Sequence, residues 1–379
     1  MNCRVCNSKL ELLLKYDNMP KAAQNFPNAD DLNDECGEDL RVCECVSCGL
    51  VQLDNEPVPY YKEVIRASAF SEEMRQFRSN QFKEFVKKYS LKNKKVIEIG
   101  CGKGEFVSLM RDAGTNAYGI EYSPESVEEC RKSGLNVTKH YIEDSEERLP
   151  NSPYDCFFIM NFFEHLPDPN SVLGALHNSL SDDGLGLIEV PNFDMIIRNN
   201  LFSEFISDHL FYFSKDTLRL TLERNGFEIV ECEEVWHDYI ISAVVRKRKR
   251  TSLKTFQDQQ IKIKNEIHKF IDNYGDKKIA VYGAGHQALA IMSLTNMGNR
   301  VKYVVDDAPF KQNKYTPATH VPIVPESRLK EDPVDAIIVM AASYSDEVAR
   351  KLEKKYKHID YAILRDFGLE KAGINPTND

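Results

Sequence analysis

A buried strand that runs into a glycine-rich turn is the feature that most limits the fold of this chain. Residues 96–99 read Val-Ile-Glu-Ile, and the turn that follows contains Gly100, Gly102 and Gly104. Glycine is needed where a backbone takes a positive φ or approaches a ligand closely. The turn therefore predicts a cofactor site, although a dinucleotide site prefers the longer spacing G-x-G-x-x-G.

Strand ends further along the chain carry polar side chains. Glu121 closes the strand-like run 118–121, where a carboxylate can accept both ribose hydroxyls of an adenosine. Asp144 follows the next run and is the candidate for the adenine edge, and a fourth run, 154–160, leads into Asn161. Strands and helices alternate to about residue 248, which predicts a parallel sheet with helices on both faces.

A second strand–glycine–helix signal lies in the last third of the chain. Its turn contains Gly283 and Gly285. Helical spacing over residues 251–273 indicates a connecting helix before it. We therefore expect an α/β protein with two Rossmann-like sheets. The predicted parts are a small metal-binding module at 1–60, a cofactor domain at 61–250 and a second α/β domain at 251–379, which includes the connecting helix.

Two C-x-x-C pairs mark the N-terminal module as a zinc site. Cys3 and Cys6 form the first pair, and Cys45 and Cys48 form the second. Four thiolates complete the closed tetrahedral shell of structural zinc, and in so small a module the metal would supply folding energy. Four free cysteines in a reduced protein are the alternative. Cys43 lies close enough to compete as a ligand, but Cys45 fits the paired spacing better.

Charge and cysteine content limit the partners and the compartment. The formal net charge is -10, which argues against a nucleic-acid binder or an anionic-membrane binder. No apolar run is long enough to span a bilayer, and the chain opens with MNCRVC rather than with a signal peptide. Ten cysteines without such a signal favour a reducing compartment. We expect a cytoplasmic protein with a small-molecule substrate and with no membrane or nucleic-acid partner.

Over residues 94–192 the sequence closely resembles the class I methyltransferases, which use S-adenosylmethionine. The resemblance rests on the EIGCGKG turn, on Glu121 and on the strand that leads into Asn161. It implies that the turn lines the methionine part of the cofactor and that Glu121 holds the ribose. The stretch after Asn161 would sit beside the methyl group, and Glu98 would accept from the turn backbone or from the methionine ammonium.

Nearly the whole chain resembles the sugar C-methyltransferases, which act on nucleotide-linked keto-deoxysugars. The order CRVC … CVSCGLVQL, methyltransferase core and YGAG domain carries this resemblance, together with the run DDAPFKQNKYTPATHVPIVP. In that family a base removes the proton next to a keto group, and the enolate attacks the sulfonium methyl. By resemblance, His209 is the base, Asp208 its acidic neighbour, His165 a second active-site histidine and His237 a substrate-binding residue.

Departures from that family fall in the predicted acceptor pocket. Ile206 stands where the family has a tyrosine, and another tyrosine expected near residues 65–70 is missing. Tyr344 is one candidate substitute for them. The glycines expected after His237 are replaced by Asp-Tyr. A structural histidine within an aromatic stretch is the alternative for His209.

The second glycine turn indicates that the C-terminal domain binds a nucleotide or a nucleotide sugar. Gly283 and Gly285 would let the backbone approach such a ligand, and His286 at the start of the next helix could meet a phosphate. An ordinary helix-start residue is the alternative for His286. The functions that stay open are C-methylation through an enolate, O- or N-methylation of a different acceptor, and cofactor binding without transfer. The acceptor and the oligomeric state stay open as well.

Overall fold

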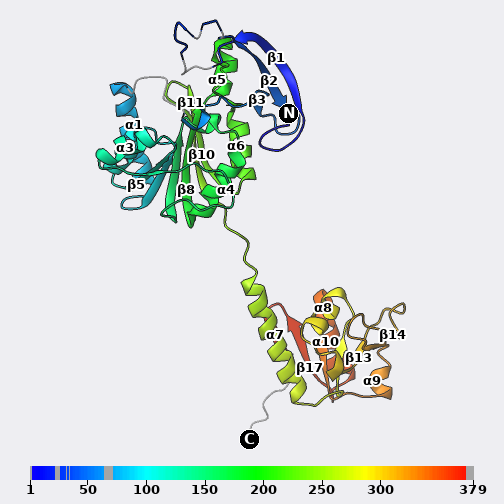
Figure 1. Ribbon diagram of the computed structural model, residues 1–379. Coiled ribbons are helices and arrows are strands. Elements are labelled where there is room, and N and C mark those ends of the chain that lie inside the picture. The colour runs from blue at the N-terminus through cyan, green and yellow to red at the C-terminus, as the bar shows by residue number, and fades with distance from the viewer. Residues whose placement is uncertain (1, 22–25, 31, 34, 64–70, 373–379) are drawn as a thin grey trace. The chain divides into compact units, whose positions relative to one another are not determined.

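The computed structural model describes residues 2–21, 26–30, 32–33, 35–63 and 71–372. The chain divides into two compact units, residues 1–249 and residues 250–379, which are described separately (Figure 1). None of the described helices combines the length and the apolar character that crossing a bilayer requires.

A seven-stranded sheet forms the centre of the first unit. Its strand order is β10-β11-β8-β7-β4-β5-β6. β11 pairs antiparallel with both of its neighbours, and the remaining pairs are parallel. The predicted Rossmann-like α/β class is confirmed. The strands are β4 (Lys95–Ile99), β5 (Asn116–Glu121), β6 (Asn136–Lys139), β7 (Tyr154–Met160), β8 (Leu180–Pro191), β10 (Phe227–Val235) and β11 (Ile240–Lys247).

Helices cover both faces of this sheet, because successive strand residues point into two different cores. Ile97 and Phe157 pack in one core with residues of α4 and α6, whereas Val96 and Phe158 pack in the other with residues of α1 and α2. The helices are α1 (Glu72–Lys88), α2 (Glu105–Asp112), α3 (Pro124–Lys132), α4 (Pro169–Ser179), α5 (Phe193–Arg198) and α6 (Lys215–Arg224), with 3-10 turns η1 (Tyr61–Glu63), η2 (Phe163–His165) and η3 (Phe202–Glu204).

The cysteine-rich N-terminal residues build a second sheet in the same unit. Its strands are β1 (Leu10–Met19), β2 (Glu38–Cys45), β3 (Val51–Leu53) and β9 (Phe211–Tyr212), in that order. β9 lies between η3 and α6 in the sequence and pairs antiparallel with β3. The module expected at residues 1–60 is therefore joined to the cofactor domain through a shared sheet, and the two form one compact unit.

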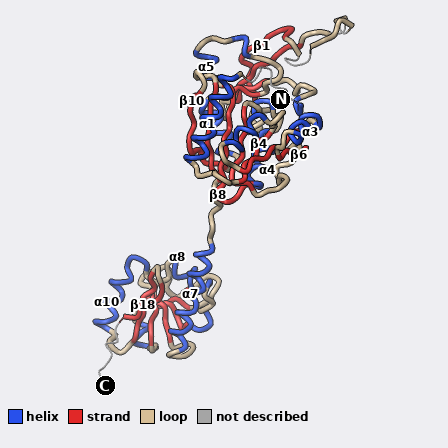
Figure 2. The backbone as a smooth tube through the Cα atoms, turned by 90° about the vertical axis from the view of Figure 1, so that its left-hand side faces the viewer, coloured by secondary structure: helices blue, strands red, loops and turns tan. Residues whose placement is uncertain are grey.

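The second unit contains another seven-stranded sheet, ordered β14-β15-β13-β12-β16-β17-β18. β15, β13, β12, β16 and β17 are parallel neighbours. Figure 2 shows helices on both sides of these strands. The strands are β12 (Ile279–Tyr282), β13 (Val301–Val305), β14 (Lys314–Tyr315), β15 (Pro322–Val324), β16 (Ala336–Val339), β17 (Asp360–Arg365) and β18 (Gly368–Ala372).

The predicted connecting helix belongs to the core of the second unit. It is α7 (Lys254–Asp272), and its apolar stripe of Ile263, Ile267 and Phe270 is buried there. A stripe at this spacing faces one direction and is buried where it meets the sheet. The other helices are α8 (His286–Leu294), α9 (Arg328–Glu331) and α10 (Ser345–Lys355), with 3-10 turns η4 (Gly298–Arg300) and η5 (Ala342–Tyr344).

Candidate active site

The glycine turn after β4 has the backbone shape that its sequence predicts. Gly100, Gly102 and Gly104 have φ values of 68°, 53° and 78°, a region that side chains other than glycine rarely adopt. A Cβ added to Gly100 would lie 2.5 Å from the Phe162 ring. The turn thus brings bare backbone to the carboxyl edge of the sheet, where α/β sheets bind their ligands.

Glu121 ends β5 beside this turn, and two backbone amides hold its carboxylate. Oε2 accepts from the Gly102 amide at 2.9 Å, and Oε1 accepts from the Ser123 amide at 2.9 Å. Each carboxylate oxygen has a second lone pair, so that Glu121 can also accept from two neighbouring hydroxyls.

A small cavity opens at this carboxylate. Its wall includes Gly100 and Glu121 as predicted, and it also includes Lys62, Tyr122 and Tyr141, which the sequence analysis did not single out. The Lys62 ammonium lies 4.4 Å from the centre of the Tyr141 ring. His140 and a set of apolar side chains complete the wall: Ile99, Ile120, Ile142, Phe162, Leu166 and Val172.

The missed residues differ in how visible they are in the sequence. Tyr122 directly follows Glu121, so that its place at the strand end could have been inferred. Tyr141 likewise follows β6 by two residues. Lys62 lies in η1, far away in the sequence, and no local pattern indicates its position.

The remaining predicted cofactor residues lie in different surroundings. Glu98 is buried on β4. Asn161 follows β7 with a φ of 50°, and its amide donates to the Glu189 carbonyl. Asp144 is exposed and accepts from the Glu146 amide. Among the described residues, His140, Tyr141 and Ile142 line the cavity from this strand end, whereas Asp144 is not part of that lining, and its role at the adenine stays a prediction.

His165 and His209 meet in the predicted catalytic region. Their ring centroids are 4.8 Å apart in an edge-to-face arrangement. Nδ1 of His165 lies 2.7 Å from the backbone carbonyl oxygen of Asp208. Because a carbonyl oxygen only accepts, this nitrogen carries the proton and Nε2 keeps a lone pair. The Asp208 carboxylate points elsewhere and accepts from the Tyr60 hydroxyl at 2.8 Å.

Burial sets the charge state of this region. It lowers the pKa of His165 to about 4 and that of His209 to about 3, so that both rings are neutral at pH 7. Burial also raises the pKa of Glu164 to about 8. Glu164 was not among the predicted site residues, yet its Oε1 lies 4.0 Å from Nε2 of His165. Its place directly before His165 in the sequence was the available signal.

His237 lies apart from this group. It occupies the turn between β10 and β11, with a φ of 58°, and its side chain is 77% exposed. Its Nε2 is 3.9 Å from a carboxylate oxygen of Glu73. The structure does not bring His237 to the described cavity wall, because three successive positive-φ residues, 236–238, turn the chain outward there.

The predicted substrate residues of the second unit gather at one edge of its sheet. Gly283, with a φ of 109°, follows β12, and a Cβ there would lie 2.6 Å from the Met340 carbonyl oxygen. Gly285 precedes α8, whose first residue is His286. Tyr344 ends η5 after the neighbouring strand β16 and is 67% exposed. These residues lie where the chain crosses to opposite sides of a doubly wound sheet, a usual ligand position.

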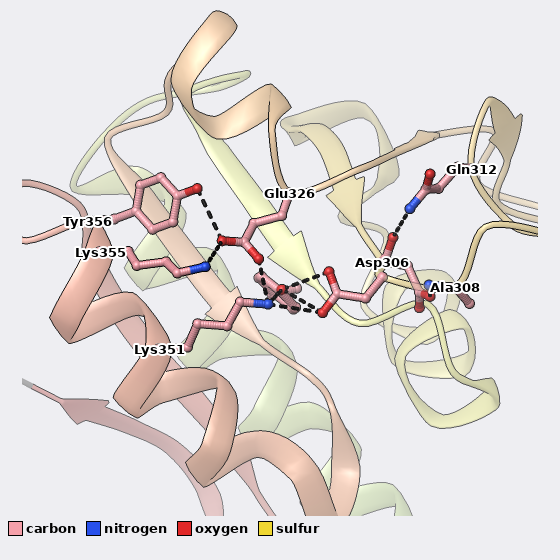
Figure 3. Close-up of polar contacts among 9 residues, drawn as sticks. Asp306, Ala308, Gln312, Glu326, Lys351, Lys355 and Tyr356 are labelled. Carbon is pink, nitrogen blue, oxygen red and sulfur yellow. Dashed lines mark hydrogen bonds and ion pairs between the residues drawn. The ribbon is translucent and has the colours of Figure 1, made fainter.

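Acidic side chains beside that edge are already engaged. Asp306 follows β13, and its carboxylate accepts from the Ala284 amide at 2.8 Å and from Lys311 at 2.9 Å. Figure 3 shows Lys351 pointing toward Glu326, which Lys355 also reaches. This network fixes α10 against the strand ends.

The four predicted zinc ligands converge. Their sulfur atoms lie within 4.8 Å of one another, with 3.7 Å between Cys3 and Cys48 and 3.3 Å between Cys6 and Cys45. Nε2 of Gln52 donates to the Cys3 sulfur at 3.2 Å. All ten cysteines are free thiols. Four sulfurs at this separation fit the donor set of structural zinc.

Two family models match the chain in succession. A methyltransferase domain matches residues 71–232, and a C-methyltransferase C-terminal domain matches residues 243–360. The C-methyltransferase NovU of Streptomyces niveus is 21% identical over 384 residues, which are 91% of this chain and 90% of that protein. The ubiquinone biosynthesis O-methyltransferase of Methylococcus capsulatus is 38% identical over 93 residues, which are 23% of this chain and 38% of that protein.

A solved S-adenosylmethionine-dependent methyltransferase from Clostridium acetobutylicum is 14% identical, with a TM-score of 0.40, and the match covers 50% of this chain and 96% of that one. The order of the two matched domains agrees with the two compact units, and the NovU match extends over both. Over both units the chain therefore resembles C-methyltransferases, and it is an S-adenosylmethionine-dependent methyltransferase.

Proposed function

We propose that this enzyme methylates a carbon next to the ketone of a nucleotide-linked keto sugar, with His209 as the base. The observation that carries the proposal is the neutral pair formed by the buried His165 and the partly buried His209, in the same unit as the glycine turn and Glu121. S-adenosylmethionine supplies an electrophilic methyl group. A neutral imidazole is the form that can accept a proton from the acceptor carbon.

In this proposal, different residues bind the cofactor and remove the proton. Glu121 and the glycine turn position the cofactor, and the aromatic cavity wall excludes water from its adenosine. His209 takes the proton from the carbon beside the ketone, and the resulting enolate carbon forms the bond to the methyl group while the methyl–sulfur bond breaks. His165 supports His209 as a neighbour whose own orientation is fixed by the Asp208 carbonyl.

The C-terminal unit would bind a nucleotide or a nucleotide sugar at its own sheet edge. Gly283 and Gly285 expose backbone at the sheet edge, and the N-terminus of α8 there favours a phosphate group. His286 and Tyr344 are the side chains at that edge. In the same proposal, zinc at the four cysteines is structural, and the reducing cytoplasm keeps their thiols available.

The test combines binding with isotope exchange. Calorimetric titration with S-adenosylmethionine and then with a panel of nucleotide sugars identifies the acceptor class. The acceptor is next incubated in deuterium oxide, and exchange at the carbon next to the ketone is followed. We expect His209→Ala to abolish exchange and His358→Ala, an exposed control in the second unit, to keep it. Exchange that persists in His209→Ala would contradict the base assignment.

Two other functions have their own outcomes in this experiment. Methyl transfer to oxygen or nitrogen would give a methylated product without carbon exchange. S-adenosylmethionine binding without turnover on any acceptor would indicate a binding protein that has lost transfer.

A further inference from the structure

Three side chains, one of them the proposed base, have the composition of a metal site that is separate from the cysteine cluster. Glu164, His165 and His209 each offer one ligand atom, and these atoms lie within 4.8 Å of one another. Glu164 and His165 belong to η2, directly after β7, and His209 lies just before β9. A backbone hydrogen bond of 2.9 Å from the Leu210 amide to the Glu164 carbonyl holds the two segments together.

The donor atoms are oriented for a cation. The Asp208 carbonyl fixes the proton of His165 on Nδ1, which leaves the lone pair of Nε2 on the side of Glu164. A backbone carbonyl on the second ring nitrogen is the usual support of a metal-binding histidine. The separation of 4.0 Å between this Nε2 and Oε1 of Glu164 is slightly longer than the distance of about 3.4 Å between two ligand atoms on a tetrahedral ion with bonds of about 2.0–2.2 Å, so that a small side-chain movement would bring both atoms onto one cation.

Glu164 supplies the second, independent observation. Its residue is 1% exposed, and its Oε2 has no hydrogen-bond partner within the described ranges. A buried carboxylate oxygen without a partner is costly, and native proteins compensate such groups with a hydrogen bond, a counter-charge or a metal. The two neighbouring imidazoles can offer lone pairs but no positive charge in their neutral form.

We propose that Glu164, His165 and His209 bind a divalent transition-metal cation such as Zn²⁺, Co²⁺ or Fe²⁺. Two imidazoles and one carboxylate suit these ions, whereas Mg²⁺ and Ca²⁺ prefer oxygen ligands throughout. Three protein ligands leave coordination positions open for small molecules. The consequence rests on the proposed function: a cation and a proton compete for the same lone pair of His209, and cation binding therefore inhibits the transfer step.

The binding test uses the full chain from zinc-supplemented cells, titrated with Co²⁺ and followed by absorption and metal analysis. We expect one added Co²⁺ per chain with weak visible bands and without the near-ultraviolet sulfur-to-cobalt band that thiolate ligands give. Glu164→Gln keeps the size of the side chain and removes its charge, and it should weaken this binding at least tenfold. His358→Ala, the exposed control, should bind like the wild type.

Three results would overturn the site: no added Co²⁺ in the wild-type chain, a thiolate band on the added ion, or unchanged affinity in Glu164→Gln. The wild-type titration alone decides the first two, so that the test does not depend on the folding of the variant. Initial rates then separate the site from the base assignment. A rate that falls with Co²⁺ occupancy and recovers with a chelator supports both, whereas a rate that rises with occupancy would overturn His209 as the base and leave the site standing.

Discussion

The imidazole rings of His165 and His209 pack edge to face, with their centroids 4.8 Å apart, although 43 residues separate them in the sequence. The contact is possible because the Leu210 amide binds the Glu164 carbonyl, which brings η2 and the segment before β9 together. The next residues, β9, pair with β3 of the cysteine-rich sheet. The position of the proposed base thus depends on the N-terminal module as well as on the cofactor domain.

The two histidines should remain neutral when the pH is lowered from about 8 to about 5. Burial lowers their pKa values to about 4 and about 3, below the value near 6.5 of a free imidazole. The unfolded chain then binds more protons than the folded one, and the free energy of unfolding falls as the pH drops from about 6.5 toward 4. Nitrogen-detected NMR should show two of the nine histidines without titration in this range.

Assignment of those two signals uses His165→Gln and His209→Gln. A midpoint near 6.5 for either buried ring would contradict the prediction.

Substitution of Gly100 by alanine should impair cofactor binding far more than substitution of Gly134. Both residues have a positive φ, 68° and 72°, so that both substitutions carry a similar backbone cost of about 1–2 kcal/mol. Only at Gly100 does the new Cβ meet another group, the Phe162 ring at 2.5 Å, whereas nothing lies within 4 Å of it at Gly134. We expect at least a tenfold loss of S-adenosylmethionine affinity in Gly100→Ala, about 1.4 kcal/mol, by calorimetry. Equal affinities in the two variants would show that the ring contact is unimportant.

Loss of one zinc ligand should disturb the proposed base through the shared sheet. Gln52 donates to the Cys3 sulfur, and its backbone is the partner of Phe211 in the β3–β9 pair. Cys6→Ser should therefore hold one zinc fewer per chain than the wild type and lose exchange at the acceptor carbon. Cys36→Ser, an exposed cysteine outside the cluster, is the control and should retain both.

Calorimetry of the same pair of variants separates the two units. The unfolding transition of the first unit should move to lower temperature in Cys6→Ser, because metal binding supplies folding energy to small modules. The transition of the second unit should stay in place. Equal zinc content in Cys6→Ser and the wild type would refute the assignment of the cluster.

Sequence patterns within short segments predicted the glycine turn, the strand end beside it and the cysteine pairs, because neighbouring residues determine these features. The glycine turn requires positive φ angles, and Glu121 is the last residue of its strand, so that both could be inferred from spacing alone. The C-x-x-C pairs likewise fix each half of the cysteine cluster. The class of fold followed from the alternation of strands and helices.

Long-range contacts were not predictable in the same way. Lys62 reaches the cavity from η1, and Glu164 gains its importance only because His209 folds against it. Asp144 lies beyond β6, which ends at Lys139, and no strand periodicity there fixes the direction of a side chain. His237 was inferred from resemblance, but the turn that replaces the family's glycines directs it to solvent.

Replacement of Arg78 by methionine should destabilise the first unit by about 3–5 kcal/mol, because it leaves the Glu189 carboxylate buried beside Gln81 without its counter-charge. Arg78 lies on α1 and Glu189 on β8, and both are fully buried. Arg75→Met is the matched control, since Arg75 pairs with the exposed Glu72 at 2.7 Å and such pairs contribute less than about 1 kcal/mol. Urea unfolding measures both variants.

The double variant Arg78→Met/Glu189→Met should regain most of the loss, because a buried pair replaced by apolar side chains of similar volume leaves no charge uncompensated. If Arg78→Met lowers the free energy of unfolding no more than Arg75→Met, the Arg78–Glu189 pair does not stabilise the packing of α1 on β8. The result bears on the site because the Glu189 carbonyl of β8 also accepts from the Asn161 amide.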